Sequence, residues 1–431
     1  MIDIQILRDN PDLVREKSAQ KQVEVDIDKI LALDKEHRDL LQQVESLRQQ
    51  RNEVSAQMKG GKPNQELIDR GKQIKIELAD REQLLQKTSA EFSELFRKIP
   101  NLPHDDVPVG SSEDENVVVE TVGELPHFDF EAKSHADIAV AKGWLDKERA
   151  AKVSGARFAY LKGDLVRLQW AMMQFGTNCV TDEEVIKKVI QEYELNISTK
   201  PFVPVLPPHL IKTDMYEAMD RLEPRDDRYK IEGEDLWLQG SAEHVLGSMH
   251  ANEIISEAEL PLRYVGYATS FRREAGTYGK DTEGIIRMHQ FDKLEMQSLA
   301  SPEQSYQEHI LMIGLQKHLM DALQLPYQVI NKCTADIGKP NARGWDIDVW
   351  LPGQDKYRET HTADYMTDYQ ARRLNTRLRR ADNTIELVHT NDATAFSQRP
   401  LIAIIENYQT NEGDVLVPEV LRPYMGGKER I

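Results

Sequence analysis

Cysteine is nearly absent from this chain of 431 residues, which contains Cys179 and Cys333 and no others. Two cysteines so far apart cannot build a disulfide framework, and they do not have the spacing of a thiolate zinc site. We therefore expect neither structural disulfides nor zinc. A low cysteine content is also typical of a reducing compartment, so we expect a cytoplasmic protein.

Long apolar runs and excess positive charge are also missing. No apolar stretch approaches the ~20 residues that a membrane-spanning helix needs, and residues 401–405 are a core strand or helix segment. We therefore expect no membrane partner. The 55 basic residues are outnumbered by 73 acidic ones, giving a formal charge of −18. Such a chain is unsuited to general nucleic-acid binding, although one basic strip remains compatible with it.

Residues 26–99 carry the clearest pattern, because apolar side chains repeat there at the three- and four-residue spacing of a coiled-coil seam. The seam comprises Ile30, Leu33, Leu40, Val44, Leu47 and Val54, and then Leu67, Ile74, Leu78, Leu85, Phe92 and Leu95. A glycine turn at 59–64 separates its two halves. The pattern predicts an antiparallel hairpin of two long helices, each roughly 45–50 Å long at ~1.5 Å per residue.

Basic side chains concentrate toward the tip of this hairpin: Arg48, Arg51, Arg70, Lys72 and Lys75. A solvated helical face is the usual interpretation of such charges. The functional interpretation is a lever that lays a basic edge along a nucleic-acid backbone. Composition and spacing leave both interpretations open.

Proline and acidic residues replace the periodic pattern after the hairpin, which predicts a linker at 104–135. Helical stretches near 139–150, 164–197 and 303–324 then alternate with short β-rich runs. The fold class is therefore α+β, with a helical hairpin domain at 1–103 and a larger domain at 136–431.

Residues 270–274 and 287–295 predict two strands joined by a glycine-containing loop. Side chains alternate between the two faces of a strand, so Arg272 and Glu274 share one face. Phe291, Lys293 and Glu295 share a face on the return strand. An arginine for phosphate, a ring for a base and carboxylates for an amino group suit a nucleotide. The alternative for an isolated Arg-x-Glu pair is a surface ion pair.

Three further segments carry polar groups that a plain core does not need. They are Ser241-Ala242-Glu243, residues 358–364, and Arg399 with the apolar residues 401–405 that follow it. Each alone is more often structural than functional. Together with Arg272 and Glu274 they bring two arginines and several carboxylates to one sheet, which suits a triphosphate with its magnesium ion. A helix that begins beside a guanidinium also makes an anion site.

Phe271-Arg272-Arg273-Glu274 resembles motif 2 of the class II aminoacyl-tRNA synthetases, and Arg399 with the residues after it resembles motif 3. Residues 202–210 resemble motif 1, the strand that forms the dimer. The sequences that flank these motifs narrow the resemblance to seryl-tRNA synthetase of the bacterial type. They lie at residues 7–12, 99–103, 275–282, 286–296, 368–373 and 417–425. The resemblance covers essentially the whole chain.

The resemblance implies an N-terminal antiparallel coiled-coil arm and a C-terminal class II antiparallel sheet flanked by helices. It also implies a homodimeric ligase of protein biosynthesis. Such enzymes join L-serine to ATP as seryl-adenylate, release pyrophosphate, and pass serine to the 3′ end of tRNA(Ser), and possibly of tRNA(Sec). The five basic residues near the hairpin tip would then bind tRNA.

Carried over by position, the catalytic residues are Arg272, Glu359 and Arg399. The ATP-binding residues are Arg272, Arg273, Glu274, Met288, Phe291, Glu359, Thr360, His361, Thr362 and Arg399. Glu359 and Thr362 correspond to ligands of the magnesium ion that accompanies ATP. The residues that contact serine are Ser241, Ala242, Glu243, Arg272, Glu295 and Thr394.

Several segments depart from the family pattern. Ser241-Ala242-Glu243 replaces Thr-Ala-Glu, which loses a methyl group. Residues 218–221 replace Thr-Gly-Gln-Leu, and residues 360–365 replace Ile-Ser-Ser-Cys-Ser-Asn. Residues 392–395 replace Asn-Gly-Ser-Gly. The last two changes introduce His361, Asp364 and Asp392. Serine selectivity is therefore less firmly implied than activation of an amino acid.

Two other functions remain compatible with the sequence. A paralogue could pass a small activated amino acid to a carrier protein or another tRNA, although a long hairpin has a use only with tRNA. A catalytically silent RNA-binding protein would tolerate loss of the phosphate-binding arginines, yet Arg272 and Arg399 are both present.

Overall fold

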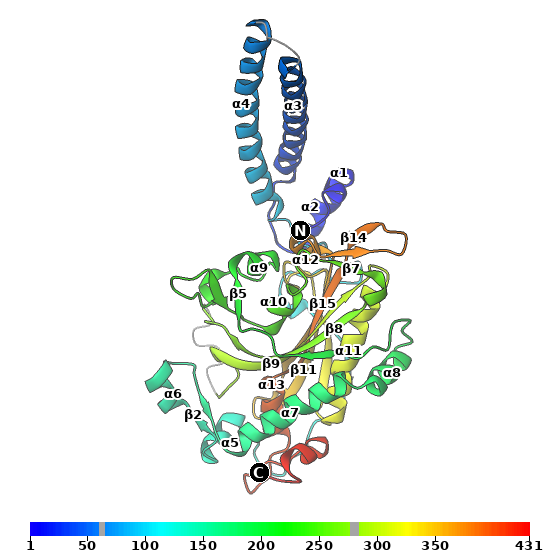
Figure 1. Ribbon diagram of the computed structural model, residues 1–431. Helices are drawn as coiled ribbons and strands as arrows, with labels where there is room; N and C mark the ends of the chain where they lie inside the picture. Colours follow the sequence, from blue (N-terminus) through cyan, green and yellow to red (C-terminus); the bar gives the residue numbers. More distant parts are fainter. Residues whose placement is uncertain (60–64, 276–283) are drawn as a thin grey trace. The chain divides into compact units, whose positions relative to one another are not determined.

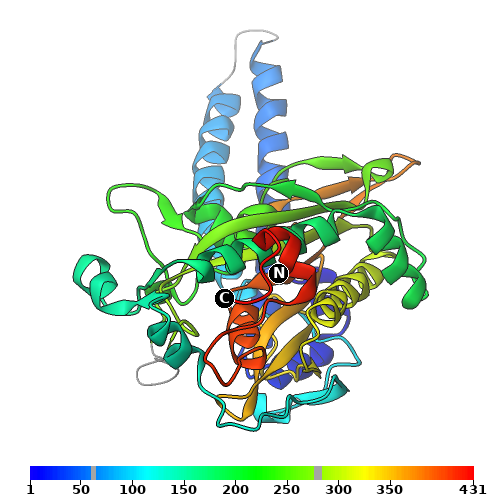
Figure 2. The same ribbon diagram turned by 90° about the horizontal axis from the view of Figure 1, so that it is seen from below.

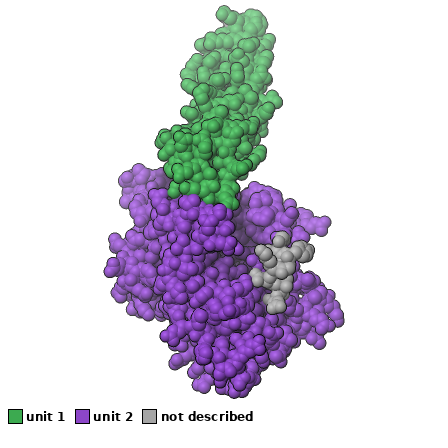
Figure 3. Space-filling view, turned by 180° about the vertical axis from the view of Figure 1, so that it is seen from behind, with its two compact units in different colours: residues 1–102 green, residues 103–431 purple. Residues whose placement is uncertain are grey.

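The computed structural model describes residues 1–59, 65–275 and 284–431. They form two compact units, residues 1–102 and 103–431, which Figure 3 colours separately. The predicted glycine turn and most of the glycine-containing loop after motif 2 lie outside the described residues. Within the described part, none of the helices has the length and apolar character needed to cross a membrane.

The first unit is a helical hairpin preceded by two short helices (Figure 1). Its helices are α1 Ile4–Asp9, α2 Pro11–Gln20, α3 Ile27–Lys59 and α4 Gln65–Phe96. Asn10 starts α2 because its side chain accepts a hydrogen bond from the Leu13 N–H, and Pro11 follows at the first helical position. The long helices α3 and α4 confirm the predicted arm.

Residues that interrupt the apolar seam are accommodated by local packing. His37 stacks on Phe92 with ring centroids 6.0 Å apart, so its ring takes the place of an aliphatic side chain. A Cβ on Gly71 would lie 3.1 Å from Cε of Met58, so glycine allows α3 and α4 to approach closely here. Outside the seam, Arg48 forms an ion pair of 2.8 Å with Glu82 across the two helices.

The second unit is built on an eight-stranded sheet with the strand order β1-β10-β11-β12-β15-β9-β8-β4. Every neighbouring pair is antiparallel except β4 and β8. The strands are β1 Val117–Val122, β10 Tyr327–Asn331, β11 Arg343–Leu351, β12 Lys356–Thr367, β15 His389–Ser397, β9 Gln290–Ala300, β8 Leu262–Phe271 and β4 Val203–Val205.

Three apolar helices pack on one face of this sheet and bury the main core (Figures 1 and 2). They are α7 Asp164–Val180, α11 Ser305–Ala322 and α13 Arg399–Asn407. The short helix α10, Ala242–Gly247, packs on β8 and β9 through Ala242, Leu246 and Ala268. The apolar run at 401–405 is thus helical and fully buried.

The remaining elements are short and surround the sheet. The helices are α5 His135–Ala141, α6 Lys147–Ser154, α8 Glu183–Glu192, α9 Thr213–Ala218 and α12 Tyr369–Leu374. The strands are β2 Leu145–Asp146, β3 Tyr160–Leu161, β5 Leu210–Lys212, β6 Leu236–Leu238, β7 Ile254–Ser256, β13 Arg377–Arg379 and β14 Ile385–Leu387. The 3₁₀ turns are Glu113–Glu115, Arg225–Asp227, Glu257–Glu259 and Glu419–Met425.

Two segments differ from the sequence expectation. Residues 104–135, expected to be a linker, contain β1, which pairs with β10 at the edge of the sheet. The valines of β1 are largely exposed, so the apolar alternation of a half-buried strand is absent there. The helical stretch at 164–197 is two helices, because Asp182 caps a new helix start with its side chain.

Candidate active site

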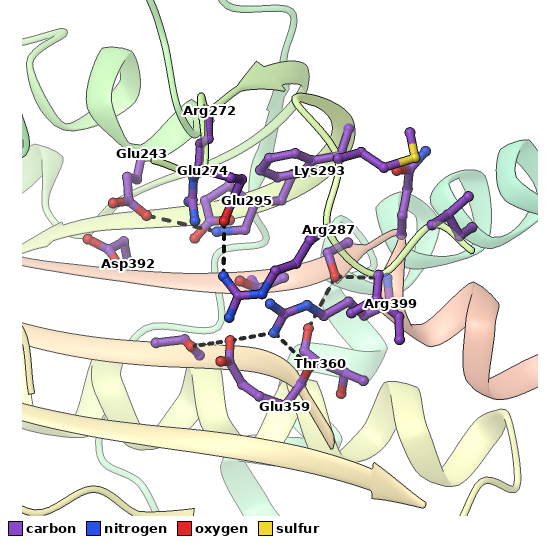
Figure 4. A pocket seen from close by; sticks show the side chains of 18 of the residues that line it. Glu243, Arg272, Glu274, Arg287, Lys293, Glu295, Glu359, Thr360, Asp392 and Arg399 are labelled. Atoms are coloured by element: carbon purple, nitrogen blue, oxygen red, sulfur yellow. Dashed lines mark hydrogen bonds and ion pairs between the residues drawn. The ribbon is translucent and has the colours of Figure 1, made fainter. Parts of the chain in front are cut away.

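A pocket of about 230 Å³ opens on the face of the sheet opposite α7, α11 and α13. Its walls come from β9, β12 and β15 and from the segment that follows β8, with the starts of α10 and α13 at its edges (Figure 4). Predicted residues that line it are Glu243, Arg272, Glu274, Met288, Phe291, Glu295, Glu359, Thr360, Thr362, Thr394 and Arg399. The fold therefore gathers residues that are separated by up to 156 positions in the chain.

Strand β9 places three side chains in the pocket by simple alternation. Phe291, Lys293 and Glu295 all line the cavity, as their spacing predicts. Partner strand β8 ends at Phe271, one residue earlier than the shared-face argument for Arg272 and Glu274 assumed. Arg272 nevertheless reaches the pocket from a non-strand segment.

Arg272 is held by two contacts. Its Nε donates to the Gly240 carbonyl oxygen at 3.0 Å. Its guanidinium carbon lies 5.3 Å from the ring centroid of Phe291. These contacts fix the plane of the guanidinium next to an aromatic face, where the interaction is favourable.

Glu274 has a left-handed backbone conformation, with φ of 50°. Such a conformation is uncommon for residues other than glycine and asparagine. Two arginines hold it: Arg287 donates to its carboxylate at 2.9 Å, and Arg157 donates to its carbonyl oxygen at 3.0 Å. Glu274 is thereby turned toward the pocket despite lying beyond the strand.

A β-bulge explains how Glu359, Thr360 and Thr362 all line the pocket. In the pairing of β11 with β12, Ile347 faces His361 and Asp348 faces Glu359, so the register skips Thr360. Residues three apart on a regular strand point to opposite faces, but the extra residue returns them to the same face. The Thr362 hydroxyl accordingly lies 3.4 Å from the Glu359 carboxylate.

Arg399 is the first residue of α13, as predicted. Its Nη1 donates to the Glu359 carbonyl oxygen at 2.8 Å and lies 3.1 Å from the Glu359 carboxylate. Desolvation favours the protonated form of Glu359, but Arg399 and Lys332 outweigh it and lower its pKa to about 2. Glu359 is therefore ionised at neutral pH and able to ligate a cation.

The pKa of Glu295 is shifted in the opposite direction. It is almost completely buried, and burial raises its pKa to about 7, although Lys293 partly offsets this and Glu243 adds to it. The Lys293 ammonium lies 2.6 Å from its carboxylate. Protonation of Glu295 near neutral pH gives this end of the pocket a titratable group.

Four predicted residues are not among the described residues that line the pocket: Ser241, Ala242, Arg273 and His361. Ser241 is buried beneath it and hydrogen-bonds Lys293 at 3.3 Å. Ala242 packs against the strands in the small cluster of α10. Arg273, next to Arg272 in the chain, instead donates its backbone N–H to Asp227.

The ring of His361, which is predicted to lie beside a nucleotide, points away from the pocket. Its ring lies on the core face of β12, 5.8 Å from Phe396, and Nε2 contacts the Ala395 carbonyl oxygen at 3.1 Å. Burial lowers its pKa to about 3, so the ring is neutral at physiological pH. His361 therefore acts in packing, since the bulge directs Thr360 and Thr362 to the pocket.

Three basic lining residues were not among the predicted site residues: Arg221, Arg287 and Lys293. Arg221 follows α9 in a loop, where no periodic signal marks it. Its guanidinium reaches Glu243 at 3.2 Å, Asp364 at 3.4 Å and Asp392 at 3.8 Å. Arg221, Asp364 and Asp392 come from three altered segments that are distant in the chain, and they meet with Glu243 in one ion cluster.

The five basic residues predicted to bind tRNA all lie exposed on the arm: Arg48, Arg51, Arg70, Lys72 and Lys75. Arg48 is paired with Glu82, and Lys72 lies 3.6 Å from Asp69. Exposed pairs of this kind contribute little to stability, so they leave the charges available to a polyanion.

Comparison with known proteins assigns both units. Residues 1–103 match the model of the seryl-tRNA synthetase N-terminal domain. Residues 228–408 match the model of the tRNA synthetase class II core domain for the G, H, P, S and T enzymes.

Relatives matched over nearly their full length and a solved structure indicate the same family. The chain is 41% identical to a serine–tRNA ligase of Symbiobacterium thermophilum, over 98% of each chain. It is 38% identical to that of Pyrococcus abyssi, over 100% of this chain and 97% of the other. The seryl-tRNA synthetase of Pyrococcus horikoshii complexed with ATP superposes with a TM-score of 0.88 at 35% identity, covering 100% and 99% of the chains. The chain therefore belongs to the seryl-tRNA synthetase family of class II aminoacyl-tRNA synthetases.

Proposed function

We propose that this protein is an ATP-dependent serine–tRNA ligase. The observation that carries the proposal is the pocket, where Arg272, just after β8, and Arg399, at the start of α13, stand together with Glu359 and Glu295. The complete resemblance of both units to serine–tRNA ligases supports it. A reaction that displaces pyrophosphate needs positioning and charge neutralisation more than a covalent protein group.

ATP would occupy the end of the pocket near Arg399 (Figure 4). Phe291 offers a ring face to the base, with Arg272 already stacked against it. Glu274 would accept a hydrogen bond from the adenine amino group, and Arg399 at the start of α13 would contact the terminal phosphates. A relative complexed with ATP supports this use of the pocket.

Magnesium fits the oxygen donors of β12. The Glu359 carboxylate is ionised and lies beside the Thr362 hydroxyl, and hard divalent ions prefer such ligands. These two residues would hold the ion, which neutralises phosphate charge when bound. The chain's own contribution is to keep Glu359 ionised and oriented by Arg399.

Activation of serine follows from the positions of Arg272 and the acids. Arg272 would hold the serine carboxylate beside the α-phosphate, so that a carboxylate oxygen attacks phosphorus and the bond to pyrophosphate breaks. Glu243, Glu295 and Thr394 would accept and position the ammonium and hydroxyl groups. A hydroxyl at the 3′ end of tRNA(Ser) then attacks the serine carbonyl carbon, and AMP leaves.

The activity should depend on pH through Glu295. Its carboxylate form is lost as the pH falls through about 7, because burial raises its pKa. We expect kcat/KM for serine in ATP–pyrophosphate exchange to fall about tenfold per pH unit below that point. Glu295→Gln should remove this change of slope from the plot of kcat/KM against pH. An equal change of slope in the variant would contradict the assignment.

We also propose a homodimer formed through the motif 1 region. Leu206, just after β4, is 85% exposed, and Trp170 is 62% exposed. Both line an apolar hollow of about 400 Å³ with Met173 and Tyr267. Large exposed apolar side chains around one edge strand are typical of an interface.

Leu206→Glu should convert the dimer into monomers. Burying a leucine contributes about 1.5–3 kcal/mol, so one charge per subunit should weaken dimerisation by at least about 100-fold. Sedimentation velocity measures the mass of each species. Leu125→Glu, at another exposed leucine, is the matched control. A dimer that survives Leu206→Glu at micromolar concentration would exclude this interface.

Serine-dependent exchange without tRNA tests the proposed function directly, with threonine, cysteine, alanine and glycine as comparisons. Exchange with serine followed by charging of tRNA(Ser) supports it, and absence of exchange with every amino acid would refute it. The bacterial subtype stays a prediction, because a bacterial and an archaeal relative are about equally similar. Charging of tRNA(Sec) and a cytoplasmic location also stay predictions.

A further inference from the structure

The amino-acid end of the pocket carries more negative charge than serine alone would balance. Four carboxylates line it: Glu243, Glu295, Asp364 and Asp392. Besides Arg272, the described cations at this end are Arg221 and Lys293. The ammonium of a bound amino acid supplies one further positive charge, and Arg272 faces the carboxylate of that amino acid. When all four acids are ionised, one carboxylate therefore lacks a counter-ion.

Asp392 is the carboxylate with the weakest pairing. It is 2% exposed, and its Oδ2 has no hydrogen-bond partner among the described residues. The nearest cation, Nη2 of Arg221, lies 3.8 Å away. Leaving a buried carboxylate oxygen without a partner is costly, so the arrangement favours a ligand that donates to it.

The oxygens of Asp392, Glu243 and Glu295 lie close enough to be bridged by one cationic group. One oxygen of each lies within 4.8 Å of the others. Two acceptors bound by one ammonium at about 2.8 Å each can be up to about 5.6 Å apart. Figure 4 shows the three carboxylates turned toward one another on one side of the pocket.

The surroundings suit an ammonium better than a divalent metal ion. Lys293 already places an ammonium 2.6 Å from Glu295 and 3.9 Å from Glu243, so these acids bind such a group within the protein itself. Arg221 and Lys293 would repel a doubly charged ion more strongly than a single charge. Burial and the neighbouring Glu243 also raise the pKa of Asp392, which an arriving ammonium would reverse.

We propose that the side-chain end of this pocket binds a cationic group. The protein would then activate L-2,3-diaminopropionate, which has an ammonium where serine has its hydroxyl. The inference rests on the proposed function, because it assumes that the pocket holds the amino acid to be activated. Asp392 would accept from the side-chain ammonium, while Arg221, itself paired with Asp364, lies 3.8 Å from the Asp392 carboxylate.

ATP–pyrophosphate exchange with serine, L-2,3-diaminopropionate and alanine tests the proposal. In the wild-type protein we expect kcat/KM for diaminopropionate to equal or exceed that for serine. In Asp392→Asn the ratio of the two should fall by about 10–150-fold, the range for a lost hydrogen bond to a charged group. Asp321→Asn, an exposed carboxylate on α11, is the matched control and should leave the ratio unchanged.

A second variant covers the case in which Asp392→Asn fails to fold. Arg221→Gln/Asp364→Ser/Asp392→Asn removes three charges of the cluster together and should shift the ratio in the same direction. Serine exchange with diaminopropionate at least 100-fold poorer would overturn this proposal and leave the ligase intact. No exchange with either would refute the ligase itself. Manganese binding without ATP that Asp392→Asn abolishes would also overturn the proposal, in favour of a metal ion.

Discussion

Replacing Arg272 with alanine should lower kcat/KM for serine-dependent ATP–pyrophosphate exchange by at least about 100–1,000-fold, the usual effect of removing a preorganised charge from a reacting group. The contacts to Gly240 and Phe291 fix the guanidinium before the substrates arrive. Its loss therefore removes charge stabilisation that water cannot supply in the same geometry. Initial exchange rates over serine and ATP concentrations measure the effect.

Two further variants distinguish the effect of the positive charge at position 272 from the effect of the planar shape of the guanidinium. Arg272→Lys keeps one positive charge but not the planar fork, so it should recover a minor part of the activity. Arg430→Ala removes an exposed arginine paired with Asp414 and should leave exchange unchanged. Exchange at the wild-type rate in Arg272→Ala would show that motif 2 has been assigned to the wrong segment.

The parts that sequence predicted well are those with a repeating physical signal. The seam of the arm has a period set by helix geometry, and β9 has the alternation of a strand, so both emerge from spacing alone. The buried helix after Arg399 is visible as an uninterrupted apolar run. These elements need no knowledge of the rest of the fold.

The parts that sequence missed depend on irregular backbone or on tertiary pairing. Spacing cannot reveal the bulge in β12 that turns the His361 ring into the core. Arg221 lies in a loop, and its partners come from two distant strands. Strand β1 has exposed valines, so no burial pattern marks it. In each case the position of the residue or strand depends on its contacts in the folded protein rather than on the local sequence.

Deleting residues 40–85 should separate the two half-reactions. The deletion removes the outer parts of α3 and α4 but keeps buried residues at the inner end of the arm, such as Ile30, Leu33 and Phe96. The pocket lies wholly within residues 221–399, so exchange should stay within about twofold of the full-length value. Aminoacylation of tRNA(Ser) should fall by at least about 100-fold, because the arm supplies the phosphate contacts.

Charge reversal on the intact arm shows whether its basic edge causes that loss. Arg51→Glu/Lys75→Glu should weaken tRNA binding by at least about tenfold and reduce the salt dependence of binding by a slope of about 2, near 1 per lost contact. Lys35→Glu/Lys98→Glu reverses two exposed charges of the same unit outside the predicted set, so it should retain the wild-type slope. Binding at several salt concentrations gives each slope. Equal losses in both double variants would mean that net charge, and not the tip, attracts the tRNA. Loss of exchange together with aminoacylation in the deletion would mean that the arm supports the catalytic unit rather than the tRNA.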